Sequence, residues 1–172
     1  DLGRSYLLTE LVEFIPCVNE FKHTLSHFGS WMKPECVPTP MSLAPARSWI
    51  QWEPLGVALI MSSWNYPMMG ILQPLAQAIA AGNSAIMKPS EMSPKTAEVL
   101  KELFDSLHDE RYQVVLGGPE VAKEITQQPF DLIIFTGSTE KGKLVARAAA
   151  QNLVPCILEL GGKSPIIIDK GC

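Results

Sequence analysis

Four short segments of the sequence carry residues whose types suit the binding of a nucleotide and the handling of an anionic intermediate. In chain order they are residues 64–67 (WNYP), 88–91 (KPSE), 135–142 (FTGSTEKG) and 158–163 (LELGGK). Together they offer a side-chain amide donor, a cation beside a carboxylate, a loop of the size that seats a phosphate, and a candidate general base. This combination predicts an enzyme that binds a nucleotide.

The third segment joins an apolar run to a helical pattern. Backbone N–H groups in such a turn, with a helix N-terminus behind them, bind phosphate. The residues of this predicted phosphate site are Gly137, Ser138, Thr139, Glu140, Lys141 and Gly142. Gly137, Gly142 and Lys143 also match a P-loop, although Leu144 stands where Ser or Thr would hold magnesium. A P-loop-type nucleotide hydrolase and an ordinary strand-to-helix turn therefore stay open as alternatives.

Lys88 and Glu91 flank Pro89 at the end of another apolar run. A Lys in this position can donate to ribose hydroxyls, and a Glu can accept from them, as acidic residues do in NAD sites. A Glu near the ribose 2′ position repels a 2′-phosphate, which favours NAD over NADP. A solvated turn is the plainer alternative for these two residues.

Asn65 and Glu159 are the candidate catalytic side chains. Asn65 has an uncharged donor, as an oxyanion hole requires, and the Tyr66-Pro67 pair would restrict its turn. Glu159 ends an apolar run and precedes two glycines, so we expect a partly desolvated carboxylate that acts as a general base. A turn-forming Asn and a solvated Glu at a strand end are the alternatives.

Apolar runs and helical patterns alternate around these residues, and they predict the elements that position them. The expected strands are 56–61, 84–87, 112–116, 131–135 and 155–160, with 166–168 as a further one; the expected helices are 68–81, 93–107, 120–126 and 140–152. We expect Ser93 to cap the second of these helices. The alternation predicts an α/β fold with a doubly wound, mainly parallel sheet. All four motifs then fall at the carboxyl ends of strands, on one edge of the sheet, where such sheets bind ligands.

The first third of the chain has a different pattern. Residues 7–32 have apolar residues at helical spacing, with Pro16 either beginning the main helix or kinking it. Prolines then recur through residues 34–45, which predicts an extended segment without helix. Residues 48–53 predict a strand with two tryptophans, either in a core or at an oligomer contact.

Composition narrows the class of protein. The 172 residues are 47% hydrophobic and 19% charged, enough for a sizeable core, and the net charge of −4 argues against a nucleic-acid partner. The sequence has neither an apolar run long enough to span a membrane nor the features of a signal peptide, so we expect a cytoplasmic location.

The cysteines and histidines predict neither disulfides nor a metal site. The scattered cysteines, at 17, 36, 156 and 172, indicate reduced thiols. His23 and His27 lie one helical turn apart, but they lack a third ligand.

In their order along the chain and in their residues, the four motifs resemble those of the aldehyde dehydrogenase superfamily. Residues 1–33 and Gly117-Gly118-Pro119 look most like its class 3 and fatty-aldehyde branch, and the resemblance covers essentially the whole chain. It implies a Rossmann-like coenzyme domain and NAD(P)-dependent oxidation of an aldehyde to a carboxylic acid through a thiohemiacetal and a thioester. Class 3 members often accept NADP as well as NAD.

The resemblance also implies roles for particular residues. Asn65 would be the side-chain half of the oxyanion hole, and Glu159 would activate the water that hydrolyses the thioester. Lys88 and Glu91 would bind the adenosine ribose, and residues 137–142 would seat the pyrophosphate. The implied coenzyme site is completed by Trp64, and by Leu160 and Gly161 beside the nicotinamide.

The implied domain organisation is incomplete. Residues 1–33 correspond to an N-terminal helical segment, 34–53 to an arm used for homodimerisation, 54–162 to the NAD(P)-binding domain, and 163–172 to the start of a catalytic domain. The family's nucleophilic Cys lies a few dozen residues beyond the base, and Cys172 is too close to Glu159 to replace it. We therefore expect a segment of a longer enzyme that is inactive by itself. A non-catalytic nucleotide-binding or scaffold module is the alternative.

Overall fold

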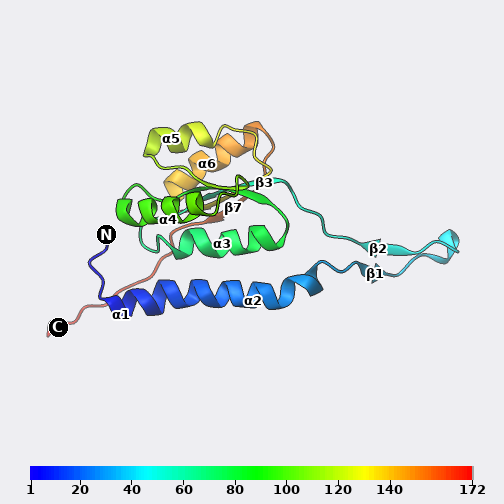
Figure 1. Ribbon diagram of the computed structural model, residues 1–172, viewed down its shortest axis with the longest axis horizontal. Coiled ribbons are helices and arrows are strands. Elements are labelled where there is room, and N and C mark those ends of the chain that lie inside the picture. Colours follow the sequence, from blue (N-terminus) through cyan, green and yellow to red (C-terminus); the bar gives the residue numbers. More distant parts are fainter. Residues whose placement is uncertain (172) are drawn as a thin grey trace.

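A five-stranded parallel sheet forms the centre of the computed structural model, which describes residues 1–171 (Figure 1). Cys172 lies outside the described residues. The strands are β3 (Val57–Met61), β4 (Ser84–Lys88), β5 (Tyr112–Val114), β6 (Leu132–Thr136) and β7 (Cys156–Glu159). Their spatial order is β5-β4-β3-β6-β7, so the direction of winding reverses between β3 and β6. The predicted α/β fold with a doubly wound parallel sheet is confirmed.

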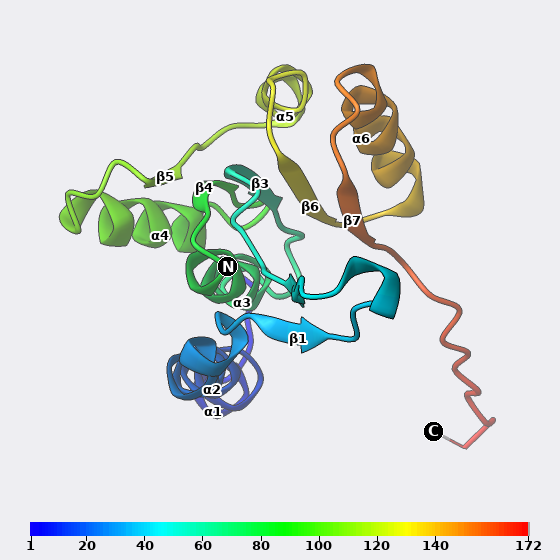
Figure 2. The same cartoon turned by 90° about the vertical axis from the view of Figure 1, so that its right-hand side faces the viewer.

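Helices cover both faces of this sheet. On one face lie α3 (Met69–Ala80) and α4 (Pro94–Ser106), and on the other α5 (Pro119–Ile125) and α6 (Thr139–Gln151) (Figures 1 and 2). Within residues 1–171, none of the helices has the length and apolar character that a membrane crossing requires.

The central strand β3 contributes to both halves of the core, because successive side chains of a strand point to opposite faces. Ile60 packs with Ile71 and Leu75 of α3, whereas Leu59 packs with Val145 and Ala149 of α6. Burial on both faces explains why the predicted strands here are continuous apolar runs without alternation.

The N-terminal helix is continuous but irregular. It consists of α1 (Tyr6–Thr9), a π-helical turn (Glu10–Phe14) and α2 (Ile15–Trp31), with Pro16 in the first turn of α2. Proline is tolerated there because the first N–H groups of a helix have no partner within it. The helix packs against α3 through Glu13, Cys17 and Phe21, whereas Leu11, Phe14 and Leu25 are exposed.

A β-hairpin follows α2 and projects away from the rest of the chain (Figure 1). Its strands β1 (Glu35–Val37) and β2 (Ser48–Ile50) pair antiparallel, and a 3₁₀ turn (Met41–Leu43) lies between them. The expectation that residues 34–45 contain no helix is wrong at this turn, which lies between the prolines rather than at one of them. Trp49 and Trp52 are exposed.

After β7 the chain has no further strand within the described residues. The strand expected over residues 166–168 is absent, and these three isoleucines are exposed. In the described structure they have no neighbouring strand with which to pair, so an apolar β-branched run alone does not form one here.

Candidate functional site

One cleft of about 920 Å³ lies at the carboxyl ends of the strands and extends between α5 and α6. Its volume is within the range of small-molecule sites, roughly 300–1,000 Å³. Strand register explains the gathering of the motifs: Met61 of β3 pairs with Lys88 of β4 and with Phe135 of β6, and Thr136 pairs with Glu159 of β7. Each of the four sequence motifs contributes residues to the lining of this cleft.

Lys88 is a buried cation at the floor of the cleft. Its side chain is only 4% exposed, and its Nζ donates to the carbonyl of Pro89 at 3.3 Å and to the Glu91 carboxylate at 3.5 Å. Because an ammonium has three donors and both of these bonds are long, Lys88 can still donate to a ligand.

Glu91 also lines the cleft, and its neighbours favour its ionised form. Partial burial by itself raises the pKa of the carboxyl, but a hydrogen bond from the backbone N–H of Glu91, the charge and hydrogen bond of Lys88, and the charge of Lys141 outweigh this. The pKa of Glu91 therefore lies below its usual value.

This shift predicts a pH response. The Glu91 carboxylate stabilises the fold above its ordinary pKa, and that contribution disappears as the pH falls through the lowered pKa of the folded state. Carboxyl NMR of the whole protein should find Glu91 titrating below an ordinary Glu, and Lys88→Met should move the midpoint upwards. Lys101→Met, which removes a cation from an exposed pair with Asp105, should leave it in place. An unshifted Glu91 in the unchanged protein would contradict the ion pair.

The N-terminus of α6 points into the cleft from β6. Gly137 and Ser138 line it, and Ser138 caps the helix by accepting from the backbone N–H of Lys141. A Cβ at Gly137 would lie 2.5 Å from the ring of Phe135, so only glycine leaves room here without moving that ring. Lys141 also lines the cleft.

The rest of the predicted phosphate loop is helix. Thr139 begins α6, Thr139 and Glu140 are exposed outside the cleft, and Gly142 is buried against Leu160. This geometry argues against a P-loop, because the phosphate-binding backbone of a P-loop lies before the helix. Only Gly137 and Ser138 of the motif precede the helix here, and Leu144 is exposed on it.

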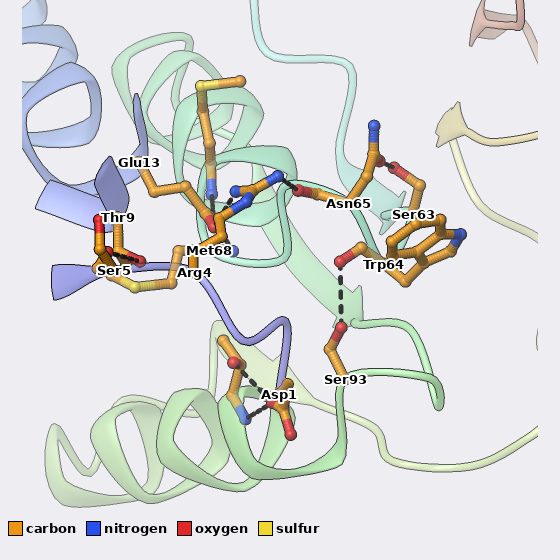
Figure 3. A network of polar contacts seen from close by, with 12 residues as sticks. Asp1, Arg4, Ser5, Thr9, Glu13, Ser63, Trp64, Asn65, Met68 and Ser93 are labelled. Carbon is orange, nitrogen blue, oxygen red and sulfur yellow. Dashed lines mark hydrogen bonds and ion pairs between the residues drawn. The ribbon is translucent and has the colours of Figure 1, made fainter. Parts of the chain in front are cut away.

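The loop between β3 and α3 carries Trp64 and Asn65 (Figure 3), and both residues line the cleft. The Oδ1 atom of Asn65 accepts from the Ser63 hydroxyl at 2.6 Å, which leaves Nδ2 as the outward donor. The carbonyl of Trp64 accepts from Ser93 Oγ at 3.0 Å.

The predicted capping role of Ser93 is wrong, because its hydroxyl is bonded to Trp64 instead of to its own helix. The Asp1 carboxylate replaces it, accepting from the backbone N–H groups of Lys95 and Thr96 at 3.3 and 2.8 Å.

Glu159, Leu160 and Gly161 line the cleft at the end of β7. Glu159 is exposed within the described residues, which corrects the expectation of a partly desolvated carboxylate. Successive side chains of a strand point to opposite faces. Cys156 and Leu158 of β7 pack against the core, whereas Glu159 lies with Ile157 on the other face, where both are exposed in the described residues.

Sequence reasoning missed the groove between α5 and α6 that continues the cleft. It is lined by Pro119, Ala122 and Thr126 of α5, and by Val145, Ala148 and Gln151 of α6. Residues 122 and 148 are alanines, whose small side chains leave space between the two helices. The sequence feature that could have indicated this groove is the run of small residues in α6. A run of this kind at helical spacing is equally typical of a helix packed on a core.

His23 and His27 stack on one another on α2, with ring centroids 4.2 Å apart, and His27 also stacks on Trp31. Nδ1 of His27 lies 2.8 Å from the His23 carbonyl oxygen. No group of three His, Cys, Asp or Glu side chains with the spacing of metal ligands occurs among residues 1–171.

The family model and the relatives that match this chain are all aldehyde dehydrogenases. A family model described as "Aldehyde dehydrogenase family" matches residues 1–172. The probable coniferyl aldehyde dehydrogenase of Caulobacter vibrioides is 43% identical over 99% of this chain and 36% of its own length. The 4,4'-diaponeurosporen-aldehyde dehydrogenase of Staphylococcus aureus is 42% identical over 99% of this chain and 37% of its own.

Solved structures agree with the sequence matches. The substrate-bound state of Staphylococcus aureus AldH superposes with a TM-score of 0.93 at 42% identity, over 99% of this chain and 37% of that one. Mycobacterium tuberculosis aldehyde dehydrogenase complexed with NAD⁺ gives 0.83 at 30% identity, over 95% of this chain and 34% of that one. The chain thus spans little more than a third of the length of these relatives.

Proposed function

Because the chain belongs to the aldehyde dehydrogenase family, we propose that the whole protein oxidises an aldehyde to a carboxylic acid with NAD, and that residues 54–162 bind the coenzyme. The observation that carries this proposal is the single cleft into which β3, β4, β6 and β7 deliver all four motifs. Separate clefts for these residues would have left no common ligand for them.

The lining of the cleft fits an extended dinucleotide. Lys88 and Glu91 offer a donor and an acceptor to ribose hydroxyls. The N-terminus of α6 at Ser138 offers backbone N–H groups and a positive helix end to the pyrophosphate. The groove between α5 and α6 suits the flat adenine ring, and Leu160 and Gly161 border the remaining end. In this arrangement the bound coenzyme would supply the hydride acceptor.

We propose NAD as the preferred coenzyme, with NADP accepted. The Glu91 carboxylate repels a 2′-phosphate, but Lys88 and Lys141 place positive charge beside it. The complex of the Mycobacterium tuberculosis relative with NAD⁺ supports the same choice.

Asn65 and Glu159 would carry the chemistry of this chain. Asn65 Nδ2 is free to donate to an oxyanion as negative charge develops on it. Glu159 would take a proton from the water that hydrolyses the thioester, and it lines the same cleft as Asn65. The thiol nucleophile is not supplied by the described residues, because none of Cys17, Cys36 and Cys156 lines the cleft.

Coenzyme titration of the whole protein tests the proposal. Lys88→Met should raise the Kd for NAD by about tenfold or more, because a desolvated ion-to-hydroxyl hydrogen bond contributes roughly 1.5–3 kcal/mol. Trp64 lies in the cleft, so quenching of tryptophan fluorescence can follow the binding. Lys101→Met is the matched control, since Lys101 forms an exposed pair with Asp105 on α4. Equal Kd values for both variants, or no NADH from any aldehyde, would overturn the proposal.

We also propose a homodimer formed through the hairpin β1–β2. The hairpin projects from the body, exposes Trp49 and Ile50, and leaves the outer edges of a two-stranded sheet free within the described residues (Figure 1). Light scattering should give twice the chain mass for the whole protein, and a monomer would contradict this role for the hairpin.

A further inference from the structure

The loop that carries Asn65 is held from outside by the N-terminal segment of the chain (Figure 3). Nη2 of Arg4 donates to the Asn65 carbonyl at 2.6 Å, and its guanidinium lies over the Tyr66 ring, 4.8 Å from the ring centroid. The other end of the fork, Nη1, donates to Glu13 at 3.2 Å. Arg4 is thus a bridge between the loop and the N-terminal helix.

Glu13, the partner of Arg4 on the helix, is itself held in place by burial and hydrogen bonds. Its residue is only 2% exposed, and its Oε2 accepts from the backbone N–H groups of Met68 and Met69 at 2.9 and 3.4 Å. Those N–H groups begin α3 and have no partner within the helix. One buried carboxylate therefore holds both the start of α3 and the arginine that reaches Asn65.

The side chain of Asn65 is oriented separately. The Ser63 hydroxyl lies 2.6 Å from Oδ1, and this bond sets which end of the amide faces outward. Figure 3 shows the amide nitrogen pointing away from Ser63. Within residues 1–171, Nδ2 donates no hydrogen bond.

From these contacts we infer that Arg4 and Ser63 are positioning residues for Asn65. Arg4 fixes its backbone, and Ser63 turns its amide so that Nδ2 donates into the cleft. The inference rests on the proposed role of Asn65 as an oxyanion donor. A preorganised donor is needed because stabilisation of developing charge requires that no group reorganise during the reaction.

The variants are Arg4→Lys and Ser63→Ala, made in the whole protein. Lysine keeps the charge beside Glu13 but lacks the planar fork that spans two acceptors. Alanine removes the hydroxyl from a loop position without touching the core. We expect each to lower kcat by about tenfold, since small misplacements of a catalytic group have effects of up to about 100-fold. Because Arg4 does not line the cleft, Arg4→Lys should leave the Kd for NAD unchanged.

The control variants carry the same substitutions at sites away from the loop. Arg111 also pairs with a carboxylate, that of Asp109, and its guanidinium lies over the ring of the adjacent Tyr112. It is remote from the loop that carries Asn65. Ser106, at the exposed end of α4, donates to the carbonyl of Leu103. Arg111→Lys and Ser106→Ala should leave kcat unchanged. Ser63→Thr, which keeps a hydroxyl, should restore most of the rate lost in Ser63→Ala.

A double-mutant cycle with Asn65→Ala decides the matter. If Arg4 and Ser63 act through Asn65, their substitutions should not lower kcat further once Asn65 is alanine. An equal further decrease in that background, or no decrease in the unchanged protein, overturns the inference. If Asn65→Ala alone leaves kcat intact, the proposed role of Asn65 fails first and the inference with it. The Kd for NAD of the Lys88→Met variant tests the proposed coenzyme site separately, and its result does not depend on any of these outcomes.

Discussion

Replacing Glu159 by Gln in the whole protein should leave one rapid turnover of NADH per active site and then lower the steady-state rate by about 10²- to 10⁴-fold, the range of general acid–base effects. The amide keeps the shape of the side chain but cannot take a proton from water. Aldehyde oxidation up to the thioester would then proceed, and its hydrolysis would stop. Stopped-flow absorbance of NADH separates the burst from the steady state.

Two comparisons sharpen this experiment. Glu98→Gln, on the exposed face of α4, should leave both phases unchanged. Residues 1–172 alone should form no NADH with any aldehyde, because no cysteine of the described part lines the cleft. Steady NADH formation by this segment, abolished in its own Glu159→Gln variant, would falsify the division of roles.

The second large effect concerns stability. Glu13→Ala should lower the free energy of unfolding of the whole protein by about 3–5 kcal/mol, the usual effect of removing one partner from a buried ion pair. The substitution leaves Arg4, whose side chain is 21% exposed, without its carboxylate, and it leaves the N–H groups that begin α3 unsatisfied. Urea unfolding measures the change.

Glu20→Ala is the matched control for Glu13→Ala. Glu20 lies on the same helix and also reaches α3, accepting from Gln77 Nε2 at 3.3 Å, but this contact is exposed. Its loss should change the free energy of unfolding by less than about 1 kcal/mol. Equal losses for the two variants would mean that burial of Glu13 adds nothing.

The sheet and its helices follow from local sequence. Strands with covered faces are apolar runs, so the predicted ranges 56–61, 84–87 and 131–135 lie within one residue of β3, β4 and β6 at each end. The gathering of the motifs at one edge follows in turn from parallel pairing. Residues 166–168 look the same locally but form no strand in the described residues, because strand formation depends on a neighbour.

The details of the site depend on contacts between distant parts of the chain. Ser93 has the sequence context of a helix cap, yet its hydroxyl bonds to Trp64, 29 positions away. The actual cap of α4 comes from Asp1, and the partner of the Asn65 carbonyl is Arg4, 61 positions away. Neither pairing has a local spacing signature. The exposure of Glu159 likewise depends on which face of β7 is packed on the core, and a residue's neighbours in sequence do not determine this.

Because of the π-helical turn at Glu10–Phe14, the number of residues in the first fourteen positions determines how the N-terminal segment is oriented. Removing one amino acid there would restore regular α-helix. It would also rotate the residues before the turn by about 100° about the helix axis. With α2 still seated on α3, Asp1 and Arg4 would swing away from α4 and from Asn65. We therefore expect single-residue deletions in this turn to be as damaging as substitutions in the cleft, whereas the exposed turn at Met41–Leu43 should accept them.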